Sequence, residues 1–143
     1  MIGHVDPTRV QFDVFKGLDR EHPIEMLNLV RLRDLAAYPE GHGLAGQGVT
    51  GAEAYRQYGA GAGPIVARIG ASILWRGAFE ATLIGPAGEV WDHAFIARYP
   101  TGHAFLEMIS DPAYAEAVVH RQAAVETSRL IRCKPSDTGA TFG

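Results

Sequence analysis

The chain has 143 residues and a net charge of −3, and 47% of its residues are hydrophobic, which is enough for the core of one domain. Its Lys and Arg residues are scattered, which argues against a nucleic-acid or anionic-membrane surface. The longest uncharged runs, such as residues 41–52, are far shorter than the roughly 18 apolar residues of a membrane span. The first residues do not resemble a signal peptide and Cys133 is the one cysteine, so we expect a cytoplasmic protein without an intrachain disulfide.

An N-terminal arm over residues 1–22 is expected to precede the main domain. Asp6 and Pro7 favour the start of a short helix, whose apolar residues come before Gly17. A short helix outside the main pattern of a domain often packs on a neighbour or covers an edge. The main domain is expected over residues 23–134, and residues 135–143 are expected to form a flexible tail.

The first expected strand spans residues 24–33 and has apolar residues on both of its sides. Residues 34–50 form a Gly-rich loop that contains two matches to the G-x-G-x-x-G pattern. That pattern binds a dinucleotide when it directly follows a strand, whereas here residues 34–40 separate the two. We therefore interpret the loop as a connection and not as a nucleotide site.

A helix is expected after this loop. Thr50 and Glu53 form a capping box, and apolar residues recur on one face as far as Ile69. Pro64 lacks the backbone N–H that a helix interior needs, so it predicts a kink or a break in the middle of the helix.

Residues 71–99 predict a β-hairpin. Its first strand is expected over residues 71–84, with Ile73 and Trp75 on the same side, and residues 85–88 have the composition of a turn. Its second strand, residues 89–99, alternates with period two and is largely apolar on both sides. This pattern predicts a central strand that is covered on both faces.

Two helices and a final strand complete the expected elements. Thr101 can cap the first helix, and Asp111 with Pro112 can start the second. The last strand is expected over residues 128–134, with Cys133 as a core residue.

The order strand, helix, strand, strand, helix, strand predicts an α+β protein with the ferredoxin-like split βαβ fold and a four-stranded antiparallel sheet. The helices cover one face of such a sheet, and a second copy stacked sheet to sheet would cover the other. We therefore predict a homodimer, in the form of a dimeric α+β barrel. Strand parity places five residues in its interface, namely Leu27, Leu29, Arg31, Ile96 and Arg98. On the same side, Asp92 is expected to pair with Arg31 or Arg98, within or across subunits.

Three runs of the sequence resemble a known family: AYRQYGAGAGPIVARIGASIL, FIARYPTGHAFLEMISDPAY and HRQAAVETSRLI. Residues 24–133 are similar to the domain-of-unknown-function family number 1330, within the dimeric α+β barrel superfamily. The likeness rests on the helix tyrosines Tyr55 and Tyr58, on the corner Tyr99-Pro100-Thr101 and on Arg121 in the last helix. The resemblance implies the fold and the dimer, and it implies no reaction.

The same superfamily includes cofactor-independent monooxygenases and haem-degrading enzymes. Such enzymes have an Asn on the first strand, and Asn28 fits that position. The haem-degrading members also have a Trp and a His where this chain has Met108 and Ala117, and His120 lies on another face of the helix. We therefore expect neither haem nor another cofactor.

Six residues are candidates for a ligand-binding site between the sheet and the helices, namely Asn28, Tyr55, Tyr58, Trp91, His93 and Arg121. Their convergence predicts a small polar-lined cavity, because a buried Asn or Arg is costly without a partner. The alternative is a structural network, in which Arg121 bonds backbone carbonyls and His93 is a satisfied core histidine. The spacing of the His, Asp and Glu residues supplies no full ligand set, so no metal site is expected.

Two functions remain open at this stage. In the first, the protein is a small-molecule-binding enzyme, such as a cofactor-independent oxidoreductase or isomerase that acts on an aromatic or carboxylated metabolite. Arg121 would then anchor the anion, and His93 would serve as acid or base. In the second, the protein is a non-catalytic accessory or binding dimer with a vestigial pocket. A closed, dry layer between sheet and helices favours the second function, and an open cavity that reaches Arg121 favours the first.

Overall fold

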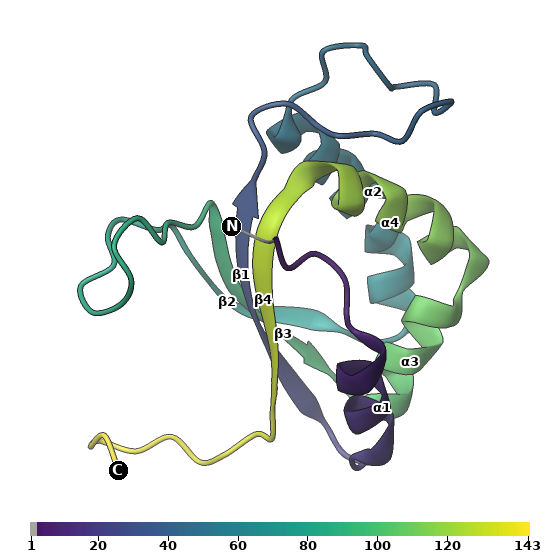
Figure 1. Ribbon diagram of the computed structural model, residues 1–143. Coiled ribbons are helices and arrows are strands. Elements are labelled where there is room, and N and C mark those ends of the chain that lie inside the picture. Colours follow the sequence, from purple (N-terminus) through teal and green to yellow (C-terminus); the bar gives the residue numbers. More distant parts are fainter. Residues whose placement is uncertain (1–2) are drawn as a thin grey trace.

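The computed structural model describes residues 3–143, which form one antiparallel sheet with helices on one of its faces (Figure 1). The strands are β1 (Ile24–Leu32), β2 (Ser72–Gly77), β3 (His93–Tyr99) and β4 (Val125–Cys133), and their order across the sheet is β2-β3-β1-β4. All three neighbouring pairs are antiparallel. The predicted α+β, ferredoxin-like fold is confirmed.

Four helices accompany the sheet: α1 (Arg9–Gly17), α2 (Gly51–Arg68), α3 (Gly102–Ser110) and α4 (Pro112–Ala124). The helix starts follow the expected caps. The Thr50 hydroxyl accepts a hydrogen bond from the backbone N–H of Glu53, Thr101 caps α3, and Asp111 caps α4 ahead of Pro112. Within residues 3–143, no helix combines the length and the apolar character that crossing a membrane needs.

The core lies between the sheet and helices α2, α3 and α4. Alternation along β1 turns Ile24, Met26 and Val30 toward the helices, where all three are buried. Their neighbours Leu27 and Leu29 point to the other face of the sheet and are half-buried in one chain. We call this second face, which carries no helix, the open face (Figure 1).

The β2–β3 hairpin differs from its prediction. β2 ends at Gly77 instead of at residue 84, and β3 begins at His93 instead of at residue 89. A bulge between Ile73 and Trp75 puts their side chains on opposite faces, because Ile73 pairs with Ala97 and Trp75 with Ile96. Residues 78–92 form a long loop that projects away from the sheet (Figure 1).

Asp92 explains why the regular β1–β3 pairing begins only at His93. Its carboxylate takes the place of a strand carbonyl as acceptor, because it accepts a hydrogen bond from the backbone N–H of Leu32 at 2.6 Å. The expected ion pair of Asp92 with an arginine is therefore absent within the described chain. Arg31 pairs instead with Glu126 at 3.0 Å.

Three further expectations differ from the structure. Of the kink or break expected at Pro64, the break is absent: α2 is one helix through Pro64, where both Pro64 and Ala60 are exposed, so water can reach the carbonyl that loses its N–H partner. β4 begins at Val125, directly after α4, and not at residue 128. Cys133 is exposed, because it lies on an edge strand and its pairing with Glu25 turns it to the open face.

Candidate ligand-binding site

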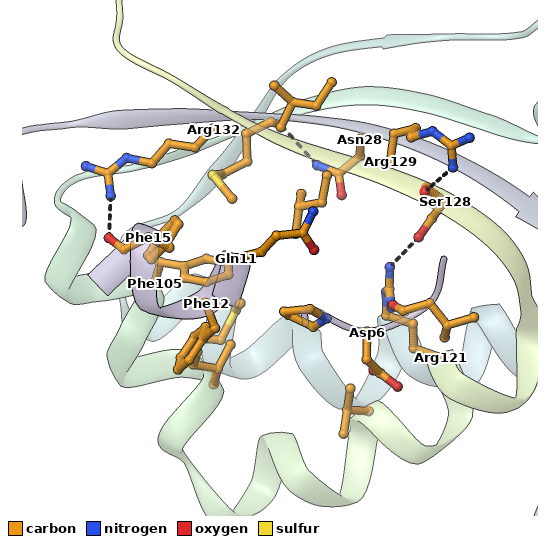
Figure 2. A pocket seen from close by; sticks show the side chains of 18 of the residues that line it. Asp6, Gln11, Phe12, Phe15, Asn28, Phe105, Arg121, Ser128, Arg129 and Arg132 are labelled. Atoms are coloured by element: carbon orange, nitrogen blue, oxygen red, sulfur yellow. Dashed lines mark hydrogen bonds between the residues drawn. The ribbon is translucent and has the colours of Figure 1, made fainter. Parts of the chain in front are cut away.

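A cavity of about 920 Å³ lies between the helix-covered face of the sheet and helices α3 and α4 (Figure 2). Its floor comes from β1 and β4 through Met26, Asn28 and Leu130, and its far wall from Phe105, Met108, Ile109 and Val118. Most of these side chains are apolar. The volume is that of pockets that bind small organic molecules, roughly 300–1,000 Å³.

The N-terminal arm covers this cavity without filling it. None of the residues of α1 is buried, although Gln11, Phe12, Val14 and Phe15 face the cavity. An amphipathic helix normally buries its apolar face against a core. Here that face lies over unfilled space.

The arm is fixed at its first residues by β4 and α4. The His4 carbonyl accepts hydrogen bonds from the backbone N–H and the hydroxyl of Ser128, each at 2.7 Å. The His4 N–H donates to the Thr127 hydroxyl, and the Gln122 amide donates to Asp6. These contacts place the start of the arm along one rim of the cavity.

The far end of the arm is fixed by α3 and by Arg132 of β4. The Phe15 ring lies 4.8 Å from the Phe105 ring, and the Arg132 guanidinium lies 4.7 Å from the centre of the Phe15 ring on another side. Arg132 also donates to the backbone carbonyl of Phe15 (Figure 2) and to that of Asp19. Between these two attachments, residues 7–14 span the opening.

Arg121 reaches the cavity wall from α4. Its guanidinium donates one hydrogen bond to the Val5 carbonyl at 2.5 Å and another to the Ser128 hydroxyl at 3.2 Å (Figure 2). A guanidinium has five N–H donors, so these two bonds leave others free. The bond to the Val5 carbonyl agrees with the prediction that Arg121 belongs to a structural network. The open cavity beside the guanidinium agrees with the prediction that Arg121 lines a ligand site.

Three tyrosines supply most of the hydroxyl groups of the wall. Tyr58 of α2 and Tyr114 of α4 have their hydroxyl oxygens 2.8 Å apart, and the Tyr99 hydroxyl of β3 points to the Met108 sulfur. Burial raises the pKa of Tyr114 far above its usual value, and the neighbouring Tyr58 raises it further. Burial likewise raises the pKa of Tyr99. Both side chains are therefore neutral hydrogen-bonding groups at physiological pH.

Asn28 lies in the cavity floor, as its strand parity predicts. Its side-chain amide donates to the Met26 carbonyl at 3.0 Å on the same strand. The amide oxygen of Asn28 stays available as an acceptor toward the cavity. Of the six candidate residues, Asn28, Tyr58 and Arg121 thus line one cavity.

Tyr55 and His93 form a separate pair outside the lining of this cavity. Their rings stack at 4.9 Å with an angle of 21° between their planes. Burial raises the pKa of Tyr55 to about 12, and burial, helped by the charge of Arg76, lowers the pKa of His93 below its usual 6.5. His93 is therefore a neutral imidazole at neutral pH.

Trp91 is on the opposite face of the sheet from the other candidates. It lies in the loop before β3, under the Arg129 guanidinium at 5.5 Å, and lines a hollow of about 150 Å³ with Arg31 and Glu89. The expectation that Trp91 faces the helices assumed that the strand began at residue 89. Because β3 begins at His93, the strict alternation does not extend to Trp91.

Sequence reasoning did not place Tyr114, Ser128 or the arm in this wall. The spacing of Tyr114 on α4 is that of a core residue, and only the hydrogen bond with Tyr58 marks it as part of the polar wall. The arm is separated from its β4 and α4 contacts by more than 110 residues, so no local pattern connects them. Within residues 3–143, no three His, Cys, Asp or Glu side chains are grouped so as to hold a metal ion.

Solved structures that resemble this chain share its architecture. Two crystal structures of the RPA0582 protein, a protein of unknown function from Rhodopseudomonas palustris, are 58% and 57% identical to it, with TM-scores of 0.90 and 0.87. The first, of the methylated protein, is matched over 97% of this chain and 99% of that one, and the second over 95% and 99%. The Arabidopsis thaliana protein At3g17210 has a TM-score of 0.50 at 14% identity, over 81% of this chain and 98% of its own, which shows the fold alone.

A family model also matches the sequence. The model of DUF1330, described as a domain of unknown function, matches residues 42–132, which include Tyr58, Tyr114 and Arg121 but neither the arm nor Asn28. No match is found among curated proteins. The match spans well over half of the chain, as the resemblance of its three motif runs predicts. The chain belongs to the DUF1330 family.

Proposed function

We propose that the protein binds a small amphipathic metabolite with an acidic group in the cavity between its sheet and its helices. The observation that carries this proposal is a cavity of about 920 Å³ that α1 covers and does not fill. The apolar side chains that face this space, among them Met108, Ile109 and Val118, lack there the neighbours that a packed core would give them. A bound molecule with an apolar body would restore that packing.

The charges around the cavity favour an acidic ligand. The guanidinium groups of Arg121 and Arg132 lie beside it, whereas Asp6 is the one carboxylate among its described lining residues and already accepts a hydrogen bond from Gln122. Guanidinium groups bind carboxylates through charge-assisted hydrogen bonds. Arg121 is the better placed of the two, because it keeps N–H donors free at the junction of α4 and β4.

The proposal concerns binding and assigns no reaction. His93, the candidate acid or base, is stacked on Tyr55 outside the cavity lining. The open volume beside Arg121 favours a ligand site over a vestigial pocket, since a vestigial pocket would be expected to have collapsed into a dry layer.

A fluorescence titration with 1-anilinonaphthalene-8-sulfonate, an aromatic anion, tests the proposal. Ala115 of α4 lines the cavity, so Ala115→Trp should fill part of the volume and weaken binding of the probe at least tenfold. Ala113, on the same helix and exposed, does not line the cavity, so Ala113→Trp is the matched control and should bind as the wild type does. Equal binding by both variants, with unchanged circular dichroism, would place the probe elsewhere and refute the proposal.

We also propose that the protein works as a homodimer through its open face. Leu27, Leu29 and Ile96 lie on this face, and Ile131 and Trp75 beside them are about half exposed, at 46% and 52%. Neighbouring apolar side chains on a flat sheet surface usually mark an interface. A second copy that stacks its own open face there would cover them and leave each cavity on the outside of the pair.

A further inference from the structure

The hydroxyl pair of Tyr58 and Tyr114 is the most unusual polar feature of the cavity wall. Two helices, α2 and α4, bring these oxygens to 2.8 Å, and both residues line the cavity. One of the two hydroxyl groups donates its proton to the other, so each oxygen takes part in one hydrogen bond. The proton of the accepting hydroxyl is left over, and no described residue accepts it.

A free phenol proton at the edge of an apolar cavity favours an acceptor from a ligand. Such a donor costs free energy when no acceptor satisfies it, and it gains most in a site that excludes water. The surroundings keep it a donor, because burial and the neighbouring Tyr58 raise the pKa of Tyr114 and outweigh the charge of Arg121, which lowers it. The mutual hydrogen bond also polarises the outer O–H and makes it a stronger donor.

We propose that the Tyr58–Tyr114 pair is a subsite for a carbonyl oxygen, so that the ligand is an apolar oxo acid with a ketone as well as a carboxylate. This inference rests on the ligand-binding function proposed above and adds the chemical class of the ligand. The pair donates its free proton to the ketone oxygen, and Arg121 holds the carboxylate. Between these two poles, Met108, Ile109 and Val118 contact the apolar body.

The Asn28 side chain lies in the floor of the same cavity and is a second group that a ketone could contact. One of its two amide N–H groups donates to the Met26 carbonyl, so the other N–H and the amide oxygen remain. The tyrosine variants distinguish the two groups, because a ketone held by Asn28 would keep its preference when both tyrosines are replaced.

Two probes of matched shape test the subsite: 6-acetyl-2-naphthoic acid, which has a ketone, and 6-ethyl-2-naphthoic acid, which does not. The wild type should bind the acetyl probe about tenfold more tightly, the value of one well-placed hydrogen bond. The ketone stretching band of the bound acetyl probe should shift to lower frequency in the infrared spectrum. In Tyr58→Phe and in Tyr58→Phe/Tyr114→Phe, the preference should fall and in the double variant disappear, with the band returning toward its position in an apolar solvent.

Tyr55→Phe is the matched control. Tyr55 lies one turn before Tyr58 on the same helix, its ring is 5.6 Å from that of Tyr58, and it does not line the cavity. This variant should keep both the preference and the band shift. If Tyr114→Phe lowers thermal stability too far, Tyr58→Phe alone gives the same readout.

The outcomes separate the two proposals. Equal affinities for both probes in the wild type, with an unshifted ketone band, overturn the subsite and leave the binding function standing. Failure of both probes to bind, together with no effect of Ala115→Trp on anilinonaphthalene sulfonate, overturns both proposals. Preference for the acetyl probe that persists in the double variant also overturns the subsite, because the ketone would then bind elsewhere.

Discussion

Gly51, the first residue of α2, occupies a position where no side chain fits. A Cβ atom there would lie 1.9 Å from the Arg33 carbonyl oxygen, a backbone atom that cannot move alone. We expect Gly51→Ala to lower the free energy of unfolding by about 1–3 kcal/mol, the usual cost of overpacking a closely packed site. Urea denaturation followed by circular dichroism measures it.

Gly59 provides the control for this substitution. It lies in the same helix, it is exposed, and an added Cβ would meet nothing within 4 Å. Gly59→Ala should therefore stabilise the protein by about 0.5–1 kcal/mol through helix propensity. Two alanine substitutions with the same sign would contradict the close approach of α2 to the end of β1.

His120 should make stability depend on pH. Burial, helped by the charge of His42, lowers the pKa of His120 below its usual 6.5, and its Nδ1 lies 2.6 Å from the Tyr38 hydroxyl. As the pH falls through 6.5, the unfolded chain takes up a proton more readily than the folded one, so stability present at neutral pH is lost. Urea midpoints at pH 7.5 and pH 5.5 should differ less in His120→Asn than in the wild type.

Tyr38→Phe tests whether the pH dependence of stability comes from the Tyr38–His120 hydrogen bond or from the titration of His120. This variant loses the hydroxyl but keeps the imidazole in its half-buried place on α4, so its pH dependence should persist. His93, whose pKa burial also lowers, should supply the pH dependence that remains in His120→Asn. Parallel pH profiles of the wild type and His120→Asn would show that His120 does not contribute.

Helix α1 should be the first element to open, because it has no buried residue and is held mainly at the two ends of the arm. Phe15 is its main apolar contact, against Phe105 and Arg132. Phe15→Ala should raise the open population, and with it the rate of tryptic cleavage after Lys16, about tenfold. Mass spectrometry of the fragments measures this rate.

Phe142→Ala is the control for α1, since Phe142 is fully exposed in the C-terminal tail. It should leave cleavage after Lys16 unchanged. If Phe15→Ala is cleaved no faster than Phe142→Ala, the ring of Phe15 does not hold the arm in place.

Short-range chemistry explains which elements the sequence could predict. The capping box of Thr50 and Glu53, the Thr101 cap and the pair Asp111–Pro112 act within four residues, and each of them marks the start of a helix as expected. Strand parity likewise placed Asn28 in the cavity floor. A period-two pattern breaks at a bulge, however, and this is why Ile73 and Trp75 were assigned to one face when the structure has them on opposite faces.

The parts of the site that the sequence did not predict depend on distant contacts. The cavity is covered by the N-terminal arm, whose residues 4–18 cross from β4 to α3. The arm is held by hydrogen bonds to Arg121, Ser128 and Arg132. Arg121 could be predicted from its family motif and its helical face. Its partner, the Val5 carbonyl, could not, because any residue presents the same backbone group.

At the scale of the whole molecule, the open face predicts the assembly. Light scattering at micromolar concentration should give about twice the 15.4 kDa mass of one chain. Leu29→Asp would place an unpaired charge in the stacked sheets, so it should give a monomer or unfold the chain. Leu35→Asp, at an exposed leucine of the loop after β1, should leave the mass unchanged. A folded wild-type monomer at this concentration would falsify the dimer.

The attachment of the N-terminal arm to β4 also limits when the arm can take its place during folding. Its hydrogen bonds join residues 113 to 124 positions apart in the chain, so they rank among the most non-local contacts of the fold. A ribosome makes the arm before the other elements and β4 after the other three strands. During synthesis the arm therefore waits without its partners while the rest of the sheet is made, and it can close over the cavity only after β4 has joined the sheet.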